Sequence, residues 1–275
     1  TGHLVKKGLE VTVYNRTIAK AQKWSQEYGA AFKETAFEAV KDADFVFACL
    51  GNDDDVRSVV LGESGAFAGM QPGAVFVDHT TDSADLAREL FAVCKKRGLG
   101  FLDAPVSGGQ AGAVNGVLTV MVGGESDVFE KAKPVIDAYA CNVTHLGPAG
   151  NGQLAKMVNQ IALAGAVQGL SEAIAFGMNA GLDMKKVLKV LEKGAAGSWQ
   201  MANRGETMVD DKFDFGFAID WMRKDLGIAM AEARRNGSSL PVTALVDQFY
   251  GELQAVGASR MDTSSLIKRL PRKKA

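Results

Sequence analysis

The sequence predicts an α/β fold, a doubly wound parallel sheet, followed by an all-helical segment. Between Leu9 and about Leu146, short β-rich runs alternate with segments of helical spacing, and the runs are apolar along nearly their whole length. Such runs are typical of strands that helices cover on both faces. After Pro148 the β-rich runs stop, and the chain is rich in Ala, Leu, Met, Ile and Gln. We therefore expect a sheet-containing domain over residues 1–150 and an all-helical domain over residues 151–275.

The first domain is expected to begin with the end of a helix, a turn at Gly8 and a strand from Leu9 to Tyr14. The spacing of apolar residues predicts a helix over Ala84 to Arg97, between two later strands. Strands are predicted in the segments EVTVYN, ADFVFACL, GAVFVDHT, LGFLDAP, LTVMVGG and NVTHLG.

The second domain is expected to begin with one long helix, because the sequence from Asn151 to Gly181 contains no proline and no β-rich run. At 1.5 Å per residue this helix would be about 45 Å long, longer than one small domain requires. We therefore expect it to link the two domains. Further helices are predicted over residues 183–193, 218–236 and 242–256.

Length and charge exclude several classes of partner. The chain has 275 residues and a formal net charge of -1 at pH 7, which supplies no broad cationic field for nucleic acid or an anionic membrane. No continuous apolar run approaches the roughly 20 residues that cross a bilayer, and the first residues lack the order of a signal peptide. We expect a soluble cytoplasmic protein with neither nucleic acid nor membrane as a partner.

Cysteines and histidines are few and scattered. Neither set has the spacing of a metal site: Cys49, Cys94 and Cys141, and His3, His79 and His145. We interpret the cysteines as small buried apolar residues and expect no metal and no metal-dependent mechanism.

The segment VYNRT indicates a dinucleotide cofactor. In a dinucleotide-binding βαβ unit, of the Rossmann type, the second strand ends at the adenosine ribose. An acidic residue there would bind a ribose 2'-hydroxyl and repel a 2'-phosphate, but this chain has Asn15, Arg16 and Thr17. Neutral donors and a guanidinium favour NADP(H), with NAD(H) as an alternative. The same three residues would also suit a surface turn with an exposed arginine.

Two later strands also end in residues that could bind a cofactor. Leu50, Gly51 and Asn52 follow one strand, and Thr80 and Thr81 follow the next. Ligands of open α/β sheets bind beyond the carboxyl ends of the strands, so we expect these residues at the cofactor. Asn52 could instead cap the following helix, and both roles can hold at once.

Three motifs resemble the β-hydroxyacid dehydrogenases, the family of 3-hydroxyisobutyrate dehydrogenase, tartronate semialdehyde reductase and the succinic semialdehyde and glyoxylate reductases. FLDAPVSGGQAGAVNGVLTVMVGG, at Phe101 to Gly124, resembles the substrate-binding signature of that family. GNGQLAKMVNQ resembles its catalytic helix, and FGFAIDWMRKDLGIA resembles its later lysine-aspartate segment. The resemblance runs along the whole chain and implies a Rossmann-type NAD(P)-binding domain followed by a helical domain like that of 6-phosphogluconate dehydrogenase.

The VSGG segment, Ser107 to Gly109, could bind an anion. Ser107 follows a strand and a proline, and Gly108 and Gly109 let backbone N–H groups approach an anion without interference from a Cβ atom. A substrate carboxylate is the expected ligand. The alternative is an ordinary glycine turn.

Lys156 and Asn159 lie one turn apart on the predicted long helix. The resemblance implies that Lys156 exchanges a proton with the substrate oxygen while hydride moves between the substrate carbon and the nicotinamide. It also implies that Asn159 orients the lysine and the substrate. An isolated lysine in such a helix would more often extend along the surface toward solvent.

Lys224 and Asp225 resemble the later family pair, with Lys224 facing cofactor and substrate. We expect no required contact between the two, because adjacent helix residues do not share a face. Phe217 matches a cofactor-binding aromatic of the same segment, although it could equally be a core residue. Trp221 stands where the family pattern has an aliphatic residue, which leaves the shape of the pocket open.

The family also has a first strand and a G-x-G-x-x-G turn before the helix that ends in TGHLVKKG, and both are absent from this sequence. Gly2 and Gly8 cannot replace that turn, because one lies within the helix and the other ends it. Loss of a central strand would remove hydrogen bonds and apolar burial. We therefore interpret the sequence as truncated at its N-terminus and not as a natural short form.

The leading hypothesis is an NADP-preferring oxidoreductase that interconverts a small carboxylate-bearing β-hydroxyacid, or a related short hydroxyacid, with its semialdehyde or keto form. The alternatives are an imine reductase-like enzyme and a non-catalytic scaffold with the dehydrogenase fold. Lys156 and VSGG disfavour the imine reductase, and retention of Lys156 and Asn159 disfavours the scaffold. The resemblance further implies a homodimer or homotetramer.

Overall fold

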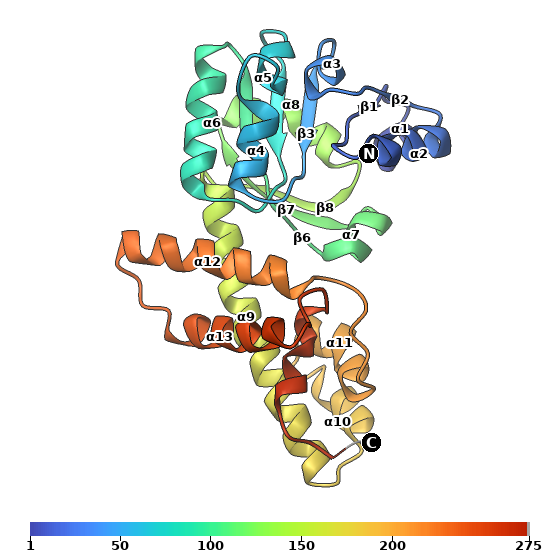
Figure 1. Ribbon diagram of the computed structural model, residues 1–275, viewed down its shortest axis with the longest axis vertical. Helices are drawn as coiled ribbons and strands as arrows, with labels where there is room; N and C mark the ends of the chain where they lie inside the picture. The colour runs from blue at the N-terminus through green and yellow to red at the C-terminus, as the bar shows by residue number, and fades with distance from the viewer. Residues whose placement is uncertain (274–275) are drawn as a thin grey trace. The chain divides into compact units, whose positions relative to one another are not determined.

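The computed structural model describes residues 1–273 and divides into two compact units (Figure 1). The first unit comprises Thr1–Lys156 and the second begins at Met157. Each unit has two hydrophobic clusters of its own. The boundary falls inside the helix α9 (Asn151–Asn179), which was predicted as one long helix from Asn151.

The main sheet of the first unit has the strand order β3-β4-β5-β7-β6, with β8 also paired to β7. Strands β3 (Phe45–Ala48), β4 (Val75–Asp78) and β5 (Gly100–Asp103) are parallel, as predicted. Strand β7 (Leu118–Gly124) runs antiparallel to β5 and to β6 (Val106–Ser107), and β8 (Ala140–His145) is parallel to β7.

The reversal at β7 departs from a fully parallel sheet and has a simple cause. The connection from β6 to β7 is the helix α7 (Gly109–Asn115), which has seven residues and is about 10 Å long. A parallel connection needs a crossover of a dozen or more residues that returns the chain to the opposite end of the sheet. This short helix leaves the chain at the same end, so the next strand runs back.

A separate two-stranded parallel sheet lies near the N-terminus of the chain. It consists of β1 (Thr12–Val13) and β2 (Ala31–Phe32), connected by α2 (Ile18–Tyr28). The predicted strand from Leu9 to Tyr14 is thus shorter than expected, while the preceding turn at Gly8 is confirmed by its φ of 80°. β2 and β6 were not predicted, because two residues are too few for a periodicity to show.

Helices flank the sheet on both faces (Figure 1). α6 (Ala84–Lys96) confirms the helix that was predicted between two strands, and it begins at the N-cap Ser83, whose side chain accepts a hydrogen bond from the backbone N–H of Leu86. The other helices of this unit are α1 (Gly2–Lys6), α3 (Ala36–Ala39), α4 (Asp53–Val60), α5 (Ala66–Gly69) and α8 (Ser126–Ile136).

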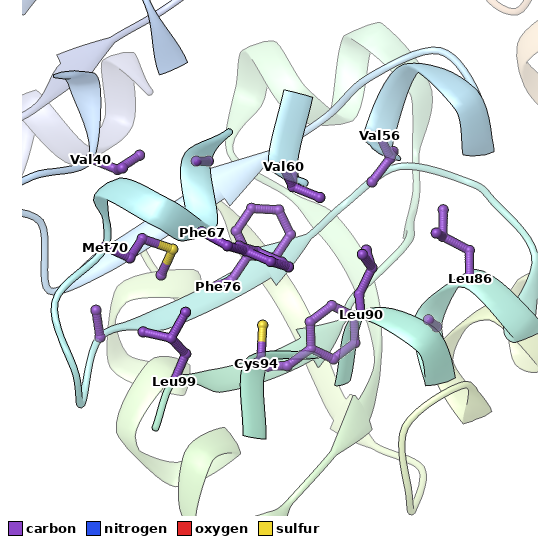
Figure 2. Packing of buried hydrophobic residues seen from close by; sticks show 14 residues of the cluster. Val40, Val56, Val60, Phe67, Met70, Phe76, Leu86, Leu90, Cys94 and Leu99 are labelled. Carbon is purple, nitrogen blue, oxygen red and sulfur yellow. The ribbon is translucent and has the colours of Figure 1, made fainter. Parts of the chain in front are cut away.

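Both faces of the sheet are buried, which explains why its strands read as continuous apolar runs. On one face Phe67 meets Phe76 edge to face, with ring centroids 4.9 Å apart, and Figure 2 shows this pair within the cluster that also holds Cys94. The prediction that the cysteines are buried is correct for Cys94 and wrong for Cys49 and Cys141, which are exposed. These two lie directly after β3 and in the edge strand β8.

The second unit consists of helices joined by loops, with no β-strand within residues 157–273. Its later helices are α10 (Met184–Leu191), α11 (Trp199–Val209), α12 (Ile219–Asn236), α13 (Pro241–Ala255) and a 3₁₀ helix at Thr263–Arg269. α11 was not predicted, since Gly205 in its middle is unfavourable for a helix. The glycine is used for close packing, because an added Cβ would lie 3.0 Å from the Leu188 side chain on α10.

α9 is long and apolar enough to cross a membrane by length and composition, although its sequence contains no uninterrupted apolar run of about 20 residues. The helix qualifies on average hydropathy because isolated polar residues interrupt its apolar sequence without outweighing it. Half of the qualifying window is buried inside the protein. A helix in the core of a domain meets the same criterion, so α9 is not by itself evidence for a membrane span.

Candidate active site

The loop after β1 reaches the first turn of the helix that follows β3. Arg16 lies 3.3 Å from the carboxylate of Asp55 on α4, and its side chain is 85% exposed. Asn15 accepts a hydrogen bond from the backbone N–H of Thr17 at 2.8 Å, which fixes the turn. The predicted cofactor residues Asn15, Arg16 and Thr17 therefore lie beside the loop that carries the next predicted group.

The loops after β3 and β4 are joined directly. The backbone N–H of Leu50 donates to Thr80 Oγ1 at 2.9 Å, and Gly51 and Asn52 follow in the same loop. Asn52 is the N-cap of α4 and accepts from the backbone N–H of Asp55, so the capping role holds. Thr81 is partly buried next to Thr80. The residues predicted at these two strand ends thus lie at one edge of the sheet.

Asp103, at the end of β5, holds the start of α9. Its carboxylate accepts hydrogen bonds from the backbone N–H groups of Gly150 at 2.8 Å and Gln153 at 2.9 Å. A Cβ atom on Gly152 would lie 2.5 Å from the carbonyl oxygens of Asp103 and Met121. This close approach of helix and strands therefore requires glycine at position 152.

Gln153 connects the same helix to the loop after β4. Its amide group donates to the carbonyl oxygen of Thr80 at 2.7 Å and accepts from the backbone N–H of Asp82 at 3.2 Å. The side chain is almost fully buried. Sequence reasoning missed Asp103 and Gln153, although a glutamine at a buried position of an apolar helix is a signal that a fixed polar partner exists.

Lys156 lies one helical turn after Gln153 and reaches the glycine segment. Its Nζ donates to the carbonyl oxygen of Val106 at 2.8 Å, and the residue is 8% exposed. Val106 directly precedes Ser107, and Gly108 and Gly109 have φ angles of 121° and 60°, the region that favours glycine. The ammonium and the predicted anion-binding segment are therefore neighbours, and Lys156 does not extend into solvent.

The second unit contains the other predicted residues. Asn159 donates from Nδ2 to Gln160 Oε1 at 2.7 Å, and Gln160 donates from Nε2 to Asp225 at 2.6 Å. Lys224 and Asp225 do contact each other, with Nζ and Oδ1 3.1 Å apart. The helix geometry does not require this contact, because adjacent residues do not share a face, but the long lysine side chain curls back to its neighbour.

Phe217 is held by its backbone. Its N–H donates to the carboxylate of Asp262 at 2.8 Å, and its ring packs on a core cluster of the second unit, so the core interpretation of this aromatic holds. Trp221 is partly exposed, and Lys224 Nζ lies 5.9 Å from its ring centroid. A cation at this distance from an aromatic face is attracted to it.

Two family models cover almost the whole chain. Residues 1–147 match the NAD binding domain of 6-phosphogluconate dehydrogenase, and residues 150–270 match the model described as NAD-binding of NADP-dependent 3-hydroxyisobutyrate dehydrogenase. The chain belongs to the β-hydroxyacid dehydrogenase family. Its members are NAD(P)-dependent enzymes that act on CH–OH groups.

Relatives of this dehydrogenase match along nearly their full length. An uncharacterized oxidoreductase of Shewanella frigidimarina is 60% identical over all of this chain and 94% of its own. The NAD-dependent L-serine dehydrogenase of Pseudomonas aeruginosa is 34% identical over 97% of this chain and 91% of its own. The structure of Mycobacterium tuberculosis 3-hydroxyisobutyrate dehydrogenase with L-serine is 29% identical, with a TM-score of 0.87, over 98% of this chain and 93% of its own.

The strand ends of the dehydrogenase fit a nicotinamide dinucleotide. Arg16 offers an exposed guanidinium after β1, and the loops after β3 and β4 are fixed to each other at the edge where such cofactors bind. Among residues 1–273 no group of three or more histidine, cysteine, aspartate or glutamate side chains is arranged to hold a metal ion.

His79, at the end of β4, is neutral in this fold. Its Nδ1 lies 2.6 Å from the carbonyl oxygen of Ala104 and must donate to it, so Nε2 accepts from the Tyr139 hydroxyl at 2.7 Å. Burial lowers the pKa of His79 to about 4. Both ring nitrogens are engaged in linking β4, β5 and the residue Tyr139 after α8, so this histidine serves the scaffold of the site and carries no charge at neutral pH.

Asp78 and Asp82 form a buried acid pair around the turn after β4. Both residues are almost fully buried, and within the described chain neither Asp82 oxygen nor Asp78 Oδ2 accepts a hydrogen bond from an N–H or a hydroxyl group. Burial, followed by the nearby charge of Asp78, raises the pKa of Asp82 to about 10, and burial raises that of Asp78. Asp82 therefore keeps its proton at neutral pH.

The retained proton of Asp82 predicts a pH dependence of stability. The folded protein keeps the Asp82 proton up to about pH 10, whereas the unfolded chain loses it near pH 4. The free energy of unfolding should therefore fall as the pH rises between these values, by up to about 1.4 kcal/mol per pH unit from this group. Asp82→Asn, which keeps a neutral group of the same shape, should remove this contribution and stabilise the protein at pH 8.

Urea unfolding at several pH values between 5 and 9 measures the effect. Asp42→Asn, at an exposed aspartate of the same unit, is the matched control, and its free energy of unfolding should depend on pH as that of the wild type does. If the free energies of unfolding of wild type and Asp82→Asn change equally with pH, Asp82 does not hold the proton.

Proposed function

We propose that this protein is an NADP(H)-preferring oxidoreductase that interconverts a small β-hydroxyacid, or a related short hydroxyacid, with its semialdehyde or keto form. The observation that carries the proposal is the 2.8 Å hydrogen bond from Lys156 Nζ to the carbonyl oxygen of Val106. It places the ammonium one residue from Ser107 and the two glycines that follow. A carboxylate and a reacting oxygen on neighbouring carbons of one substrate would match this spacing.

In the proposed mechanism the backbone N–H groups of Ser107, Gly108 and Gly109 bind the substrate carboxylate. Lys156 donates a proton to the substrate oxygen during reduction, and in the reverse direction it accepts the proton of the hydroxyl group. The nicotinamide, when bound, supplies or accepts the hydride. The hydrogen bonds of Asp103 and Gln153 fix the start of α9, so that Lys156 is held in place before substrate arrives.

The substrate class is supported by the relatives. The Pseudomonas aeruginosa relative acts on L-serine, and the Mycobacterium tuberculosis structure contains L-serine. L-serine carries a hydroxyl group on the carbon β to its carboxylate, as 3-hydroxyisobutyrate does. We extend that shared chemistry, a carboxylate with a β-hydroxyl group, to this chain.

Lys156→Ala should lower turnover of a short semialdehyde with NADPH by about 100- to 10,000-fold, the range for loss of a general acid. The cofactor dissociation constant, measured by NADPH fluorescence, should change little. Lys131→Ala is the matched control, since Lys131 also donates from Nζ to a backbone carbonyl oxygen, that of Gly73, but is exposed and away from the glycine segment. Retained turnover in Lys156→Ala would refute its assigned role.

The preference for NADP(H) rests on Arg16, whose exposed guanidinium could meet a 2'-phosphate. Asp55 lies 3.3 Å away and partly offsets its charge. Arg16→Ala should lower kcat/KM for NADPH by about tenfold, the loss of one exposed charge-assisted hydrogen bond, and leave that for NADH nearly unchanged. Steady-state assays with both cofactors measure the ratio, and an unchanged ratio would contradict the proposed role of Arg16.

We further propose that the protein forms a homo-oligomer through the second unit. One face of α9 exposes Phe176 and Val158, which are 74% and 67% exposed, and a Cβ atom on Gly169 would meet nothing within 4 Å. Exposed Ala162, Ala166 and Ala173 continue this face between them, and a contiguous apolar face at the surface is commonly covered by a partner. Small residues beside such side chains let two helices approach closely.

Sedimentation equilibrium should give a multiple of the 29.1 kDa chain mass, and Gly169→Arg should shift the protein toward the monomer. Gly227→Arg is the control, because Gly227 on α12 also has open space around its Cβ position and offers no apolar face. A monomeric wild type would contradict the proposal.

A further inference from the structure

Four side chains of the second unit form one chain of hydrogen bonds and an ion pair. It runs from Asn159 Nδ2 to Gln160 Oε1 at 2.7 Å and from Gln160 Nε2 to Asp225 Oδ2 at 2.6 Å. It continues from Asp225 Oδ1 to Lys224 Nζ at 3.1 Å. Gln160 and Asp225 are almost fully buried. Bulk water therefore cannot supply a hydrogen-bond partner to the Gln160 amide if that amide is turned the other way.

The direction of these hydrogen bonds is set from one end. Lys224 can only donate, and the Asp225 carboxylate can only accept. Gln160 must therefore turn its NH₂ group to Asp225, and its carbonyl oxygen faces Asn159. Asn159 must in turn present its NH₂ group to Gln160, which directs Asn159 Oδ1 to the other side.

We propose that Gln160 and Asp225 are positioning residues that fix Asn159 as a hydrogen-bond acceptor toward the substrate. This inference rests on the proposed function and adds the group that Asn159 recognises. An exposed carbonyl oxygen repels a carboxylate and binds a donor, so Asn159 meets the hydroxyl group of the hydroxyacid. Substrates that lack a hydroxyl or another donor at that position leave it unpaired.

Asp225→Asn should reverse the whole chain. Its new carbonyl oxygen is attracted to the Lys224 ammonium, so its NH₂ group faces Gln160. Gln160 then turns its carbonyl oxygen to position 225 and its NH₂ group to Asn159, which must turn Oδ1 inward. Asn159 would then present NH₂ to the substrate in place of an acceptor.

A second substitution should restore the original direction. In Asp225→Asn combined with Gln160→Glu, the glutamate accepts from the NH₂ group at position 225 with one oxygen and from Asn159 Nδ2 with the other. The carboxylate now lies at position 160, one step along the hydrogen-bond chain from position 225. Asn159 therefore again presents Oδ1 to the substrate. Recovery by a second change at a buried site distinguishes amide direction from general damage to packing.

The test measures hydrogen exchange of the Asn159 side-chain NH₂ group by NMR on the full chain. Exchange should be slow in the wild type, at least about tenfold faster in Asp225→Asn, and slow again in the double variant. Turnover should fall about 10- to 100-fold in the single variant, as for an unpaired hydrogen-bonding group, and recover in the double one. Asp247→Asn, at a buried aspartate that pairs with Arg223 in the same unit, is the control and should leave the Asn159 signal unchanged.

Unchanged exchange in Asp225→Asn, or fast exchange that the double variant does not slow, would overturn the inference. Exchange needs no cofactor or substrate, so it is read independently of activity. If the exchange pattern is as expected but the protein turns over no hydroxyacid, the proposed function is wrong and the inferred orientation of the Asn159 amide still holds.

Discussion

The candidate site depends on the Asp103 carboxylate. This side chain closes strand β5 and accepts both the Gly150 and the Gln153 backbone N–H groups, which α9 cannot satisfy within its first turn. Burial raises the pKa of Asp103 to about 6, and these two hydrogen bonds oppose that rise. Asp103 is thus mostly ionised at neutral pH, and it accepts hydrogen bonds from two backbone N–H groups at the start of α9. The same two hydrogen bonds fix the position of the helix start.

The positions of the proposed substrate-binding groups in the first unit follow from this connection. The chain that leaves β5 after Asp103 becomes Val106 and the glycine segment, and the helix that Asp103 holds carries Gln153 and Lys156. Gln153 ties the helix to Thr80, and Thr80 ties the loop after β4 to the loop after β3. One buried carboxylate therefore sets the spacing between the proposed proton donor, the proposed anion-binding backbone and the proposed cofactor loops.

The sequence was sufficient for the elements whose signal lies within one segment. The strands β3, β4 and β5 were predicted because each is a continuous apolar run, and the helix α9 because a long segment without proline or a β-rich run begins at Asn151. The two-residue strands and the reversal at β7 were not, since they depend on the length of α7 and on pairing between distant segments. Lys156 was found through its motif, whereas Gln153 and His79 were missed, because their roles depend on Thr80, Ala104 and Tyr139, which no local spacing connects to them.

Buried carboxyl groups have three different roles in this protein, and the groups around each carboxyl group determine its role. Asp103 meets backbone N–H groups and acts as an ionised acceptor. Asp82 is buried and lies near another acid, so it keeps its proton. Asp225 contacts the Lys224 ammonium on one side and the Gln160 amide on the other. An amide can adopt either of two orientations, and the carboxylate determines which one Gln160 adopts. In the proposed reaction none of these three acids exchanges a proton with substrate, and that role is left to Lys156.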